Sequence, residues 1–292
     1  MIRELTEETV RALLPERRAD SHKGDHGRAL IVAGSLRFRG AAALCTLGAL
    51  HTGAGLVTLA APEAVIQTMG ALIPEAMFLP VETGRLPQLR EESNLPLLMQ
   101  EAGKADALAL GPGLSGDPVT AVWCRRLLEH SANAAVTDAG ALTALQNETD
   151  VFRESPSSCI LTPHPGEAAR LLKVPAAEIV KDAPLAARTL ASLTKSVVVL
   201  KLHRSILAAP DGALWQNTAG CDGLARGGSG DFLTGMIASL CAQGLSPADA
   251  ACCAVWMHGR ASEIAAARLS RSAMTVRDLI GGLQTLYRSW EL

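Results

Sequence analysis

The sequence lacks the features of membrane-inserted, exported and nucleic-acid-binding proteins. It contains no uninterrupted run of eighteen apolar residues, and its first eight residues, MIRELTEE, are acidic and have no apolar core. Its 27 basic and 29 acidic residues are scattered and leave a net charge of −2, so no basic stripe predicts nucleic acid or an anionic membrane as a partner. We therefore expect a cytoplasmic protein that acts on a small molecule.

Cysteine spacing argues against a disulfide framework and a structural zinc site. The seven cysteines are an odd number and include no Cys-x-x-Cys pair. Cys252 and Cys253 are adjacent in a stretch that we predict as helix, where their side chains would point about 100° apart. No group of histidines and cysteines has the spacing of structural zinc ligands. Reduced thiols in a cytosolic protein are the expected state.

Short apolar runs that alternate with helical stretches predict an α/β fold with a parallel sheet. The runs are Ala29–Ala33, Leu56–Ala61, Ala107–Leu110, Ala134–Thr137, Cys159–Leu161 and Val197–Leu200. The 292 residues, with 48% hydrophobic content and a mean hydropathy of +0.20, suffice for a large core. We find no internal repeat and expect residues 1–292 to form a single domain.

The last third of the chain predicts a hairpin followed by two helices. Ser205–Ala209 and Ala213–Asn217 flank a Pro-Asp-Gly turn signal. One helix is expected from Asp231 to about Gln243, and a second from Ser246 toward Leu269. Residues 84–96 are polar and contain prolines, and we interpret them as an excursion or a lid rather than a domain boundary.

The segment from Leu224 to Gly235, LARGGSGDFLTG, is the strongest functional signal. Its glycines can turn successive N–H groups toward one anion, to which the following helix adds its positive end. A carboxylate there, Asp231, makes most sense as the base that takes a proton from an attacking hydroxyl. Helix capping alone would explain Asp231, but it would not require three glycines in the four residues before it. The segment matches neither a Walker P-loop nor a dinucleotide fingerprint.

Polar or glycine-rich turns follow several predicted strands, at the edge where open α/β sheets bind ligands. They are Gly111-Pro-Gly113, Asp138-Ala-Gly140, Thr162-Pro-His-Pro-Gly-Glu167 and Lys201-Leu-His-Arg-Ser205. His164 and Glu167 project from a turn that two prolines stiffen, and Lys201 and Arg204 offer cations for nucleotide phosphates. Tight packing, helix capping and a solvated turn are the structural alternatives, and they stay open.

Two further groups are weaker signals. The segment from Lys23 to Gly27 would close over a site or simply be solvated charge. His51, His130 and His258 lie in helical stretches among apolar neighbours, which is typical of structural histidines.

A Mg²⁺ ion held mostly by phosphates and water needs one or two protein carboxylates, for which Glu167 and Asp138 are the candidates.

In their order along the chain, these motifs resemble those of the ADP-dependent NAD(P)H-hydrate dehydratase family. The matching elements are HKGDHGRAL from His22, GAGL ending at Leu56, GPGL ending at Leu114, DAGAL from Asp138, TPHPGE ending at Glu167 and GGSGDFLTG ending at Gly235. The resemblance covers about residues 20 to 285. It implies a ribokinase-like fold, in which a mostly parallel sheet lies between helices on both faces.

The resemblance also implies a reaction and the roles of individual residues. The hydroxyl of a hydrated nicotinamide ring in NADH or NADPH is phosphorylated from ADP, phosphate leaves, and NAD(P)H, AMP and phosphate result. Asp231 would be the base, Gly228 and Gly230 would stabilise the transferring charge, and Mg²⁺ would bridge phosphate oxygens. The adenine nucleotide would contact Lys201, Leu202, His203, Arg204, Ser205 and Gly230. The hydrated dinucleotide would contact Ala41, Gly113, His164 and Asp231.

The chain departs from the family pattern in two ways. Relatives usually have Thr-Gly-Asn before the glycine loop, where this chain has Ala219-Gly220-Cys221, so either nucleotide positioning is altered or a backbone contact serves instead. Many relatives also carry an N-terminal epimerase domain, for which this chain has no room, so we expect a separate epimerase to supply the reactive epimer. Family members often form tetramers, and we expect a homo-oligomer.

Two other functions use the same residues. A ribokinase-like small-molecule kinase would use ATP and keep its phosphorylated product, but related sugar kinases carry Asn where His164 stands. A non-catalytic adenine-nucleotide-binding regulator would bind ligand without releasing phosphate, and the presence of Asp231 argues against it.

Overall fold

A ten-stranded sheet forms the centre of the protein, in a computed structural model that describes residues 1–81, 95–131 and 133–290. The strand order is β1-β10-β9-β8-β7-β6-β5-β2-β3-β4, and β9 alone of these strands runs antiparallel to its neighbours. The strands are β1 (Ile2–Glu4), β2 (Arg28–Val32), β3 (Leu56–Pro62), β4 (Met77–Val81), β5 (Ala107–Leu110), β6 (Ala134–Thr137), β7 (Ser158–Leu161), β8 (Val197–Leu200), β9 (Ile206–Ala208) and β10 (Leu214–Gln216).

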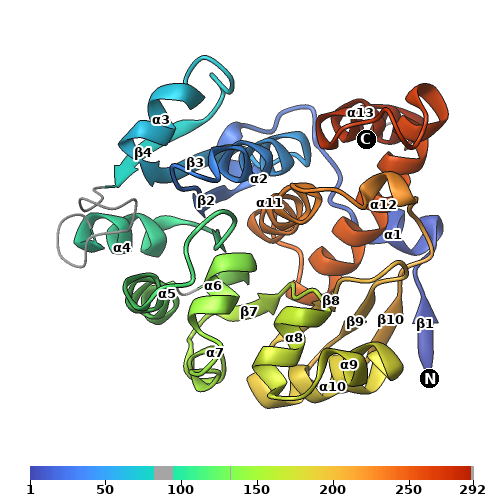
Figure 1. Cartoon of the computed structure of the whole chain (residues 1–292). Helices are drawn as coiled ribbons and strands as arrows, with labels where there is room; N and C mark the ends of the chain where they lie inside the picture. Colours follow the sequence, from blue (N-terminus) through green and yellow to red (C-terminus); the bar gives the residue numbers. More distant parts are fainter. Residues whose placement is uncertain (82–94, 132, 291–292) are drawn as a thin grey trace.

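Helices cover both faces of this sheet and give three layers (Figure 1). On one face lie α1 (Glu7–Leu13), α2 (Arg39–His51), α3 (Glu63–Met69), α11 (Ser229–Ala242), α12 (Pro247–Leu269) and α13 (Leu279–Trp290). On the other lie α4 (Leu95–Lys104), α5 (Pro118–His130), α6 (Ala139–Ala144), α7 (Asp150–Glu154), α8 (Pro165–Leu172), α9 (Ala176–Lys181) and α10 (Ala183–Thr194).

Strand β2 shows why the sheet needs both layers. Because successive side chains of a strand point to opposite faces, Ile31 packs into one hydrophobic core and Leu30 and Val32 into the other. All three side chains are at most 2% exposed. This burial on both faces explains the continuous apolar runs and is typical of parallel sheets.

The predicted strands and hairpin agree with the structure, but two edge strands were missed. β1 (Ile2–Glu4) has only three residues, all exposed, and β4 contains Pro80, which is untypical of a strand. Each lies at one end of the sheet and pairs with a single neighbour, so neither needs a long apolar run. The predicted excursion at residues 84–96 falls outside the described residues except for Leu95 and Pro96, which begin α4.

Two further features concern the state of the cysteines and the length of the helices. All seven cysteines are free thiols, and only Cys221 is partly exposed. Within the described residues, none of the helices has the length and apolar character required to cross a bilayer.

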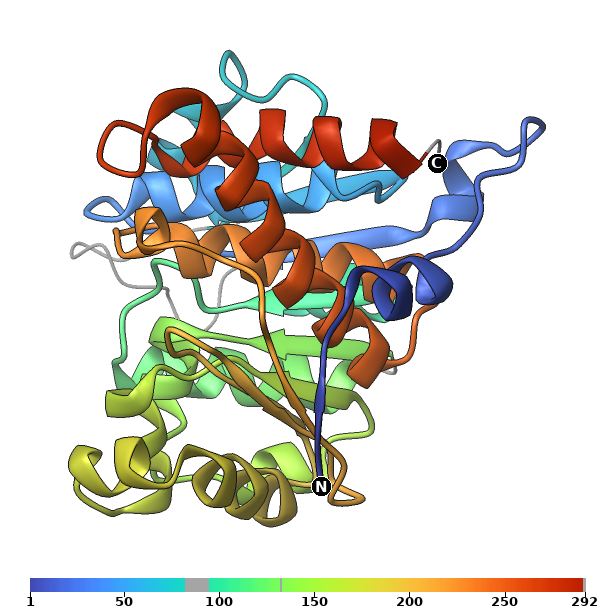
Figure 2. The same cartoon turned by 90° about the vertical axis from the view of Figure 1, so that its right-hand side faces the viewer.

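Helices α2 and α11 pack backbone against backbone. A Cβ atom on Gly48 would lie 2.2 Å from the carbonyl oxygen of Phe232, and one on Gly235 would lie 1.9 Å from that of Cys45. Only glycine permits this approach. Figure 2 shows α2 and α11 running side by side, with α13 over α2. Because the helices start at the same edge of the sheet, their first turns are brought to one place.

Candidate active site

The centre of the site is a buried ion pair between residues that follow two strands. Asp138 follows β6 and is the N-cap of α6, and Lys201 follows β8. Lys201 Nζ donates to Asp138 Oδ1 at 2.7 Å, and the Asp138 side chain is 1% exposed. The Thr234 hydroxyl, from α11, donates to Asp138 Oδ2 at 2.9 Å. The carboxyl edge of the sheet and the start of α11 therefore meet at Asp138.

Asp231 lies beside this pair at the start of α11, and its environment keeps it easy to protonate. Burial and then the negative charge of Asp138 raise the pKa of Asp231 to about 6, although Lys201 opposes the shift. A carboxylate with a pKa close to neutral suits a general base, because it is ionised at pH 7 and still accepts a proton. The predicted base is thus part of an electrostatic cluster with Asp138 and Lys201.

Of the three glycines that precede Asp231, only Gly228 has a positive φ. Gly228, the N-cap of α11, has φ +93°, and a Cβ atom there would lie 2.3 Å from Leu44 Cδ1. A Cβ atom on Gly230 would lie 3.2 Å from Lys201 Nζ. The N–H groups of the first turn of α11 have no partners within the helix and lie next to a lysine, an arrangement that favours an anion.

A cavity of about 580 Å³ opens on one side of this loop. Its lining includes six residues that the sequence predicted to bind ligand: His164, Lys201, Leu202, His203, Ser205 and Gly230. Arg204 is exposed and is not one of the described residues that line the cavity. The structure therefore brings together most of the residues expected to contact the nucleotide, and it places His164, expected on the dinucleotide side, with them.

Ala41, on α2, lies next to Gly113, in the turn after β5. Gly113 has φ +70°, and a Cβ atom there would lie 2.8 Å from Ala41 Cβ and 2.8 Å from the carbonyl oxygen of Phe38. One turn further along α2, the buried Cys45 thiol has a raised pKa, chiefly from burial and then from the charges of Asp231 and Asp138. This face of α2 therefore lies next to the acidic cluster.

His164 and Glu167 form a capping box at the start of α8. The His164 N–H donates to Glu167 Oε2 at 2.9 Å, and His164 Nδ1 accepts from the Gly166 N–H at 3.0 Å. The capping alternative is therefore present in the structure. It does not exclude ligand contact, because the His164 side chain is 52% exposed at the cavity. The Glu167 side chain is buried. Burial lowers the pKa of Lys201, but the negative charges of Asp138 and then of Glu167 outweigh it and raise that pKa.

The two carboxylates predicted as metal ligands are already engaged, Asp138 with Lys201 and Glu167 with the cap of α8. In the part of the chain that the structure describes, no group of three or more histidine, cysteine or acidic residues could hold a metal ion alone. This donor set fits an ion whose other ligands are phosphate oxygens and water. The assignment of Glu167 and Asp138 stays a prediction.

Sequence reasoning gave His258 only a structural role, but the residue also borders the cavity. His258, on α12, is 6% exposed, and its Nε2 lies 3.4 Å from the hydroxyl of Ser229 in the glycine loop. Burial lowers the pKa of His258 to about 4, so the ring is neutral near pH 7. Neither the spacing nor the neighbours of His258 in the sequence could show this contact, which depends on how α12 crosses α11.

The departure at Cys221 also lies at the cavity. Cys221 Sγ is 3.5 Å from the hydroxyl of Ser262, and the Gly220 N–H donates to Glu263 Oε1 at 2.7 Å. The side chain of Asn217, which sequence reasoning missed, holds the same turn by donating to the carbonyl of Ala219 at 2.7 Å. This wall of the cavity is therefore held by hydrogen bonds between side chains and the backbone of the turn.

The segment from Lys23 to Gly27 lies at the other edge of the sheet. It precedes β2, and a Cβ atom on Gly27 would lie 1.8 Å from the carbonyl oxygen of Ala242, at the end of α11. Asp231 is at the start of the same helix. The interpretation in which this segment closes over the site is therefore wrong, because the segment packs at the opposite end of α11.

Known proteins with similar sequences share most of this chain. A family profile described as NAD(P)H-hydrate dehydratase matches residues 29–285. A bifunctional NAD(P)H-hydrate repair enzyme of Moorella thermoacetica is 40% identical over 287 residues, which are 98% of this chain and 54% of that protein. The chain thus spans about half the length of the first curated relatives it matches. The ADP-dependent (S)-NAD(P)H-hydrate dehydratase of Bacillus subtilis is 36% identical over 289 residues, 98% of each chain.

Solved structures show the same fold. The ADP/ATP-dependent NAD(P)H-hydrate dehydratase of Bacillus subtilis, co-crystallized with ATP/Mg²⁺, superposes with a TM-score of 0.85 at 33% identity over 99% of both chains. A ribokinase-like superfamily protein of Enterococcus faecalis superposes with a TM-score of 0.83 at 25% identity, covering 99% of this chain and 96% of its own. The predicted ribokinase-like α/β fold class is confirmed.

Proposed function

The chain belongs to the NAD(P)H-hydrate dehydratase family, and from that membership we propose that it restores NAD(P)H from its (6S) hydrate at the expense of ADP. The products are NAD(P)H, AMP and phosphate. The enzyme is a hydro-lyase whose substrate is NADHX or NADPHX, the hydrates of NADH and NADPH. The observation that carries the proposal is the position of Asp231 in the first turn of α11, directly after the glycines. There its pKa is raised to about 6. A base that is ionised at pH 7 and next to an anion cradle suits phosphorylation of a hydroxyl.

In this reaction Asp231 takes the proton of the ring hydroxyl. The hydroxyl oxygen attacks the β-phosphorus of ADP, and AMP leaves. The new phosphate ester then departs as inorganic phosphate, driven by the lone pair of the ring nitrogen, and loss of a ring proton restores the dihydropyridine. Gly228 and Gly230 belong to the turn whose N–H groups stabilise charge on the transferring phosphoryl group. Lys201 adds a positive charge beside Gly230.

The cavity next to the glycine loop is the proposed ADP site. Lys201, Leu202, His203 and Ser205 line it, and Arg204 follows on the exposed side of the same turn. Mg²⁺ would be held by the nucleotide phosphates and by water, with Glu167 and Asp138 as the proposed protein carboxylates, and would neutralise charge on the phosphoryl group.

The hydrated dinucleotide is proposed to contact Ala41, Gly113, His164 and Asp231. The contact between Ala41 and Gly113 supports two of these assignments, because it forms a surface on α2 beside the acidic cluster. His164, which lines the nucleotide cavity, would then bridge the two ligands.

We propose a single-domain enzyme that acts in the cytoplasm as a homotetramer together with an NAD(P)H-hydrate epimerase. The coupling is supported by relatives that are named bifunctional NAD(P)H-hydrate repair enzymes. The epimerase would supply the epimer that this site dehydrates.

The deciding experiment follows absorbance near 340 nm while purified protein receives hydrated NADH, Mg²⁺ and either ADP or ATP, with AMP and phosphate assayed at the end. An increase that requires ADP and releases AMP and phosphate is the expected result. An increase with ATP alone would show that the co-substrate is ATP and not ADP. A stable phosphorylated product would support the kinase, and nucleotide binding without any reaction would support the regulator.

A further inference from the structure

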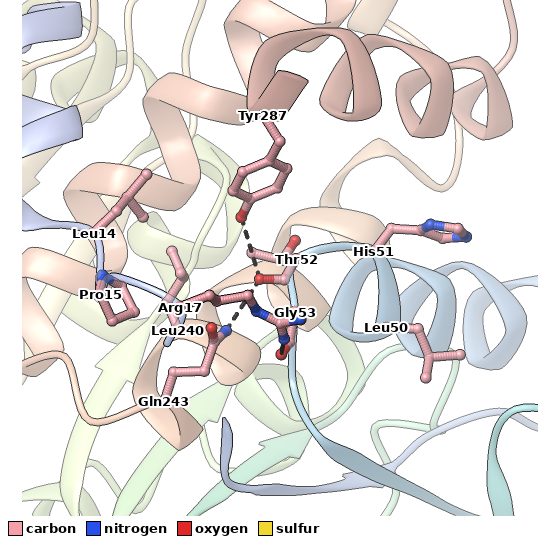
Figure 3. Close-up of a pocket in the computed structure, with 10 residues that line it drawn as sticks. All are labelled: Leu14, Pro15, Arg17, Leu50, His51, Thr52, Gly53, Leu240, Gln243 and Tyr287. Carbon is pink, nitrogen blue, oxygen red and sulfur yellow. Dashed lines mark hydrogen bonds between the residues drawn. The ribbon is translucent and has the colours of Figure 1, made fainter. Parts of the chain in front are cut away.

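Helix α11 is held firmly at the end that is remote from the active site. Gln243, the C-cap of α11, donates from Nε2 to the carbonyl of Thr52 at 3.0 Å, and the Tyr287 hydroxyl donates to the same oxygen at 3.2 Å (Figure 3). Thr52 is the C-cap of α2, so these bonds tie the two helices together where they end. The glycine loop precedes the opposite end of α11 and cannot use these contacts.

The glycine loop has little support from packing. Gly227 is exposed, and a Cβ atom there would have no atom of the described chain within 4 Å. Two cavities border the loop: the nucleotide cavity of about 580 Å³, and another of about 470 Å³ whose lining includes Leu44 and Ile73. Arg226 lines both of them. A glycine-rich segment beside two cavities has many backbone conformations open to it, so another group must fix its path.

The guanidinium of Arg226 donates hydrogen bonds to four main-chain carbonyls from two separate parts of the chain. Nε donates to Gly223 at 2.8 Å, Nη2 donates to Arg271 at 3.1 Å and to Ser272 at 3.4 Å, and Nη1 donates to Met274. The N–H groups of a guanidinium lie in a rigid plane, and these four bonds use most of them. Arg226 therefore links the start of the glycine loop to the turn that follows α12.

The turn after α12 is held at both of its ends. Ser270, the C-cap of α12, accepts from the N–H of Met274 at 3.1 Å, and Met274 is fully buried. The Thr275 N–H donates to Asp278 Oδ2 at 2.7 Å, in a capping box that begins a short 3-10 helix. A Cβ atom on Gly223 would lie 2.5 Å from Met274 Sδ, so the two segments also touch directly. The guanidinium is therefore bonded to a rigid support.

We propose that Arg226 is a positioning residue, which holds the glycine loop in the conformation that stabilises the transferring phosphoryl group. This inference rests on the proposed function. Donors that stabilise charge must be in place before the charge develops, and misplacement by about 1 Å can cost about 100-fold in rate. The guanidinium acts through the main chain of Gly227 and Gly228, which follow it directly. Because carbonyls already take most of its N–H groups, we assign Arg226 no contact with the phosphates of ADP.

The first test compares Arg226→Ala with the wild type in steady-state formation of NAD(P)H at varied ADP. We expect kcat to fall about tenfold or more while KM for ADP stays within about threefold, because the turn from Lys201 to Ser205 is untouched. The pH midpoint should stay near 6, since burial, Asp138 and Lys201 set the pKa of Asp231. An unchanged kcat would overturn the proposal. A raised KM without a loss of kcat would also overturn it, and would show that Arg226 binds ADP directly.

Rescue by guanidinium tests the bonds to the four carbonyls. Arg226→Ala leaves these carbonyls without their donor, so guanidinium chloride at about 20 mM should restore kcat several-fold, and sodium chloride at the same concentration should not. Arg226→Lys should restore less, because an ammonium cannot reach carbonyls arranged around a planar group. Arg277→Ala is the matched control, since Arg277 is exposed at the cavity of about 470 Å³, and it should keep the wild-type kcat. No recovery with guanidinium in folded Arg226→Ala would overturn the proposal.

Hydrogen exchange tests the same clamp without the reaction. The Phe232 N–H donates to the carbonyl of Gly228 at 3.1 Å, so its exchange reports whether the loop is seated on α11. We expect this amide to exchange about tenfold faster in Arg226→Lys, a variant that keeps the charge, and at the wild-type rate in Arg277→Ala. Unchanged exchange in Arg226→Lys would refute the clamp even if the wild type forms NAD(P)H. Faster exchange in a protein that forms no NAD(P)H would support the clamp and refute the proposed function.

Discussion

Lys201 and Asp138 form a buried ion pair, with Lys201 Nζ 2.7 Å from Asp138 Oδ1. The side chains are 22% and 1% exposed, so the carboxylate is removed from water and the ammonium largely so. Such a pair stabilises a fold less by its own energy than by the cost of leaving either charge alone. Here it also sets the potential at Asp231, which Asp138 makes easier and Lys201 harder to protonate. Stability and catalysis are therefore linked through the same two residues.

Removing one member of this pair should destabilise the protein more than removing both. We expect Lys201→Met to lower the free energy of unfolding by about 3–5 kcal/mol, because it leaves the carboxylate of Asp138 buried without its cation. The double variant Lys201→Met/Asp138→Asn should recover a substantial part of that loss. Urea denaturation of the single and double variants measures the coupling, and additive losses would show that the charges do not interact.

Replacing Asp231 should abolish turnover and spare binding. Asp231→Asn keeps the shape of the side chain but cannot accept the proton, so we expect the rate of NAD(P)H formation to fall about 10²- to 10⁴-fold. ADP affinity, measured by calorimetry, should stay within a few-fold of the wild type. A variant that kept more than about a tenth of the wild-type rate would rule Asp231 out as the base.

The pH dependence of kcat/KM should report Asp231 and its two neighbours. Because the base must be ionised, the rate should rise as the pH increases through about 6, the pKa of Asp231. Asp138→Asn removes a negative charge that raises this pKa, so the midpoint should move to lower pH. Lys201→Met removes the charge that lowers it, so the midpoint should move to higher pH. Shifts in the same direction for both variants would contradict this electrostatic arrangement.

His258 should act as a positioning residue for the glycine loop. Its ring is neutral near pH 7 and contacts the Ser229 hydroxyl, so His258→Gln should raise KM for ADP several-fold while the midpoint of the pH profile stays in place. The losses caused by His258→Gln and Ser229→Ala should not add in the double variant. His130→Gln, at an exposed histidine of α5, is the control and should leave KM unchanged. A shifted pH midpoint in His258→Gln would indicate a charge role instead.

The sequence predicted the main features of this site because parallel strands place their carboxyl ends together. The turns at Gly113, Asp138, Glu167 and Lys201 each follow a predicted strand, so their gathering at one edge of the sheet follows from the fold class. The ion pair itself was not foreseen. It joins residues 63 positions apart after β6 and β8, which are separated in the sheet by β7. Motifs reveal which side chains follow strands, whereas strand order decides which of them touch.

The same limit applies to Thr52. It is the C-cap of α2, and its surroundings depend on Gln243 and Tyr287, which arrive from α11 and α13. Edge strands were missed for a different reason, since β1 and β4 pair on one side only and need little apolar sequence. Local patterns predicted the interior of the sheet and failed at its margins.

Gly228 and Gly227 offer a last prediction, because these neighbours differ in what a methyl group would meet. At Gly228 the backbone has φ +93° and an added Cβ would lie 2.3 Å from Leu44 Cδ1, so Gly228→Ala is both strained and crowded. The left-handed conformation alone costs about 1–2 kcal/mol in a non-glycine residue. At Gly227 an added Cβ would have no atom of the described chain within 4 Å.

We therefore expect Gly228→Ala to lower the free energy of unfolding by at least about 1–2 kcal/mol and to lower kcat, because alanine is strained at this positive φ and either the loop or the Leu44 side chain must move. Gly227→Ala should unfold within about 0.5 kcal/mol of the wild type. Urea denaturation and the NAD(P)H assay on the two variants test the pair together. If Gly228→Ala were as stable and as active as Gly227→Ala, the positive φ of Gly228 would not be what shapes the anion cradle, and the charge stabilisation proposed for this loop would have to come from Lys201 instead.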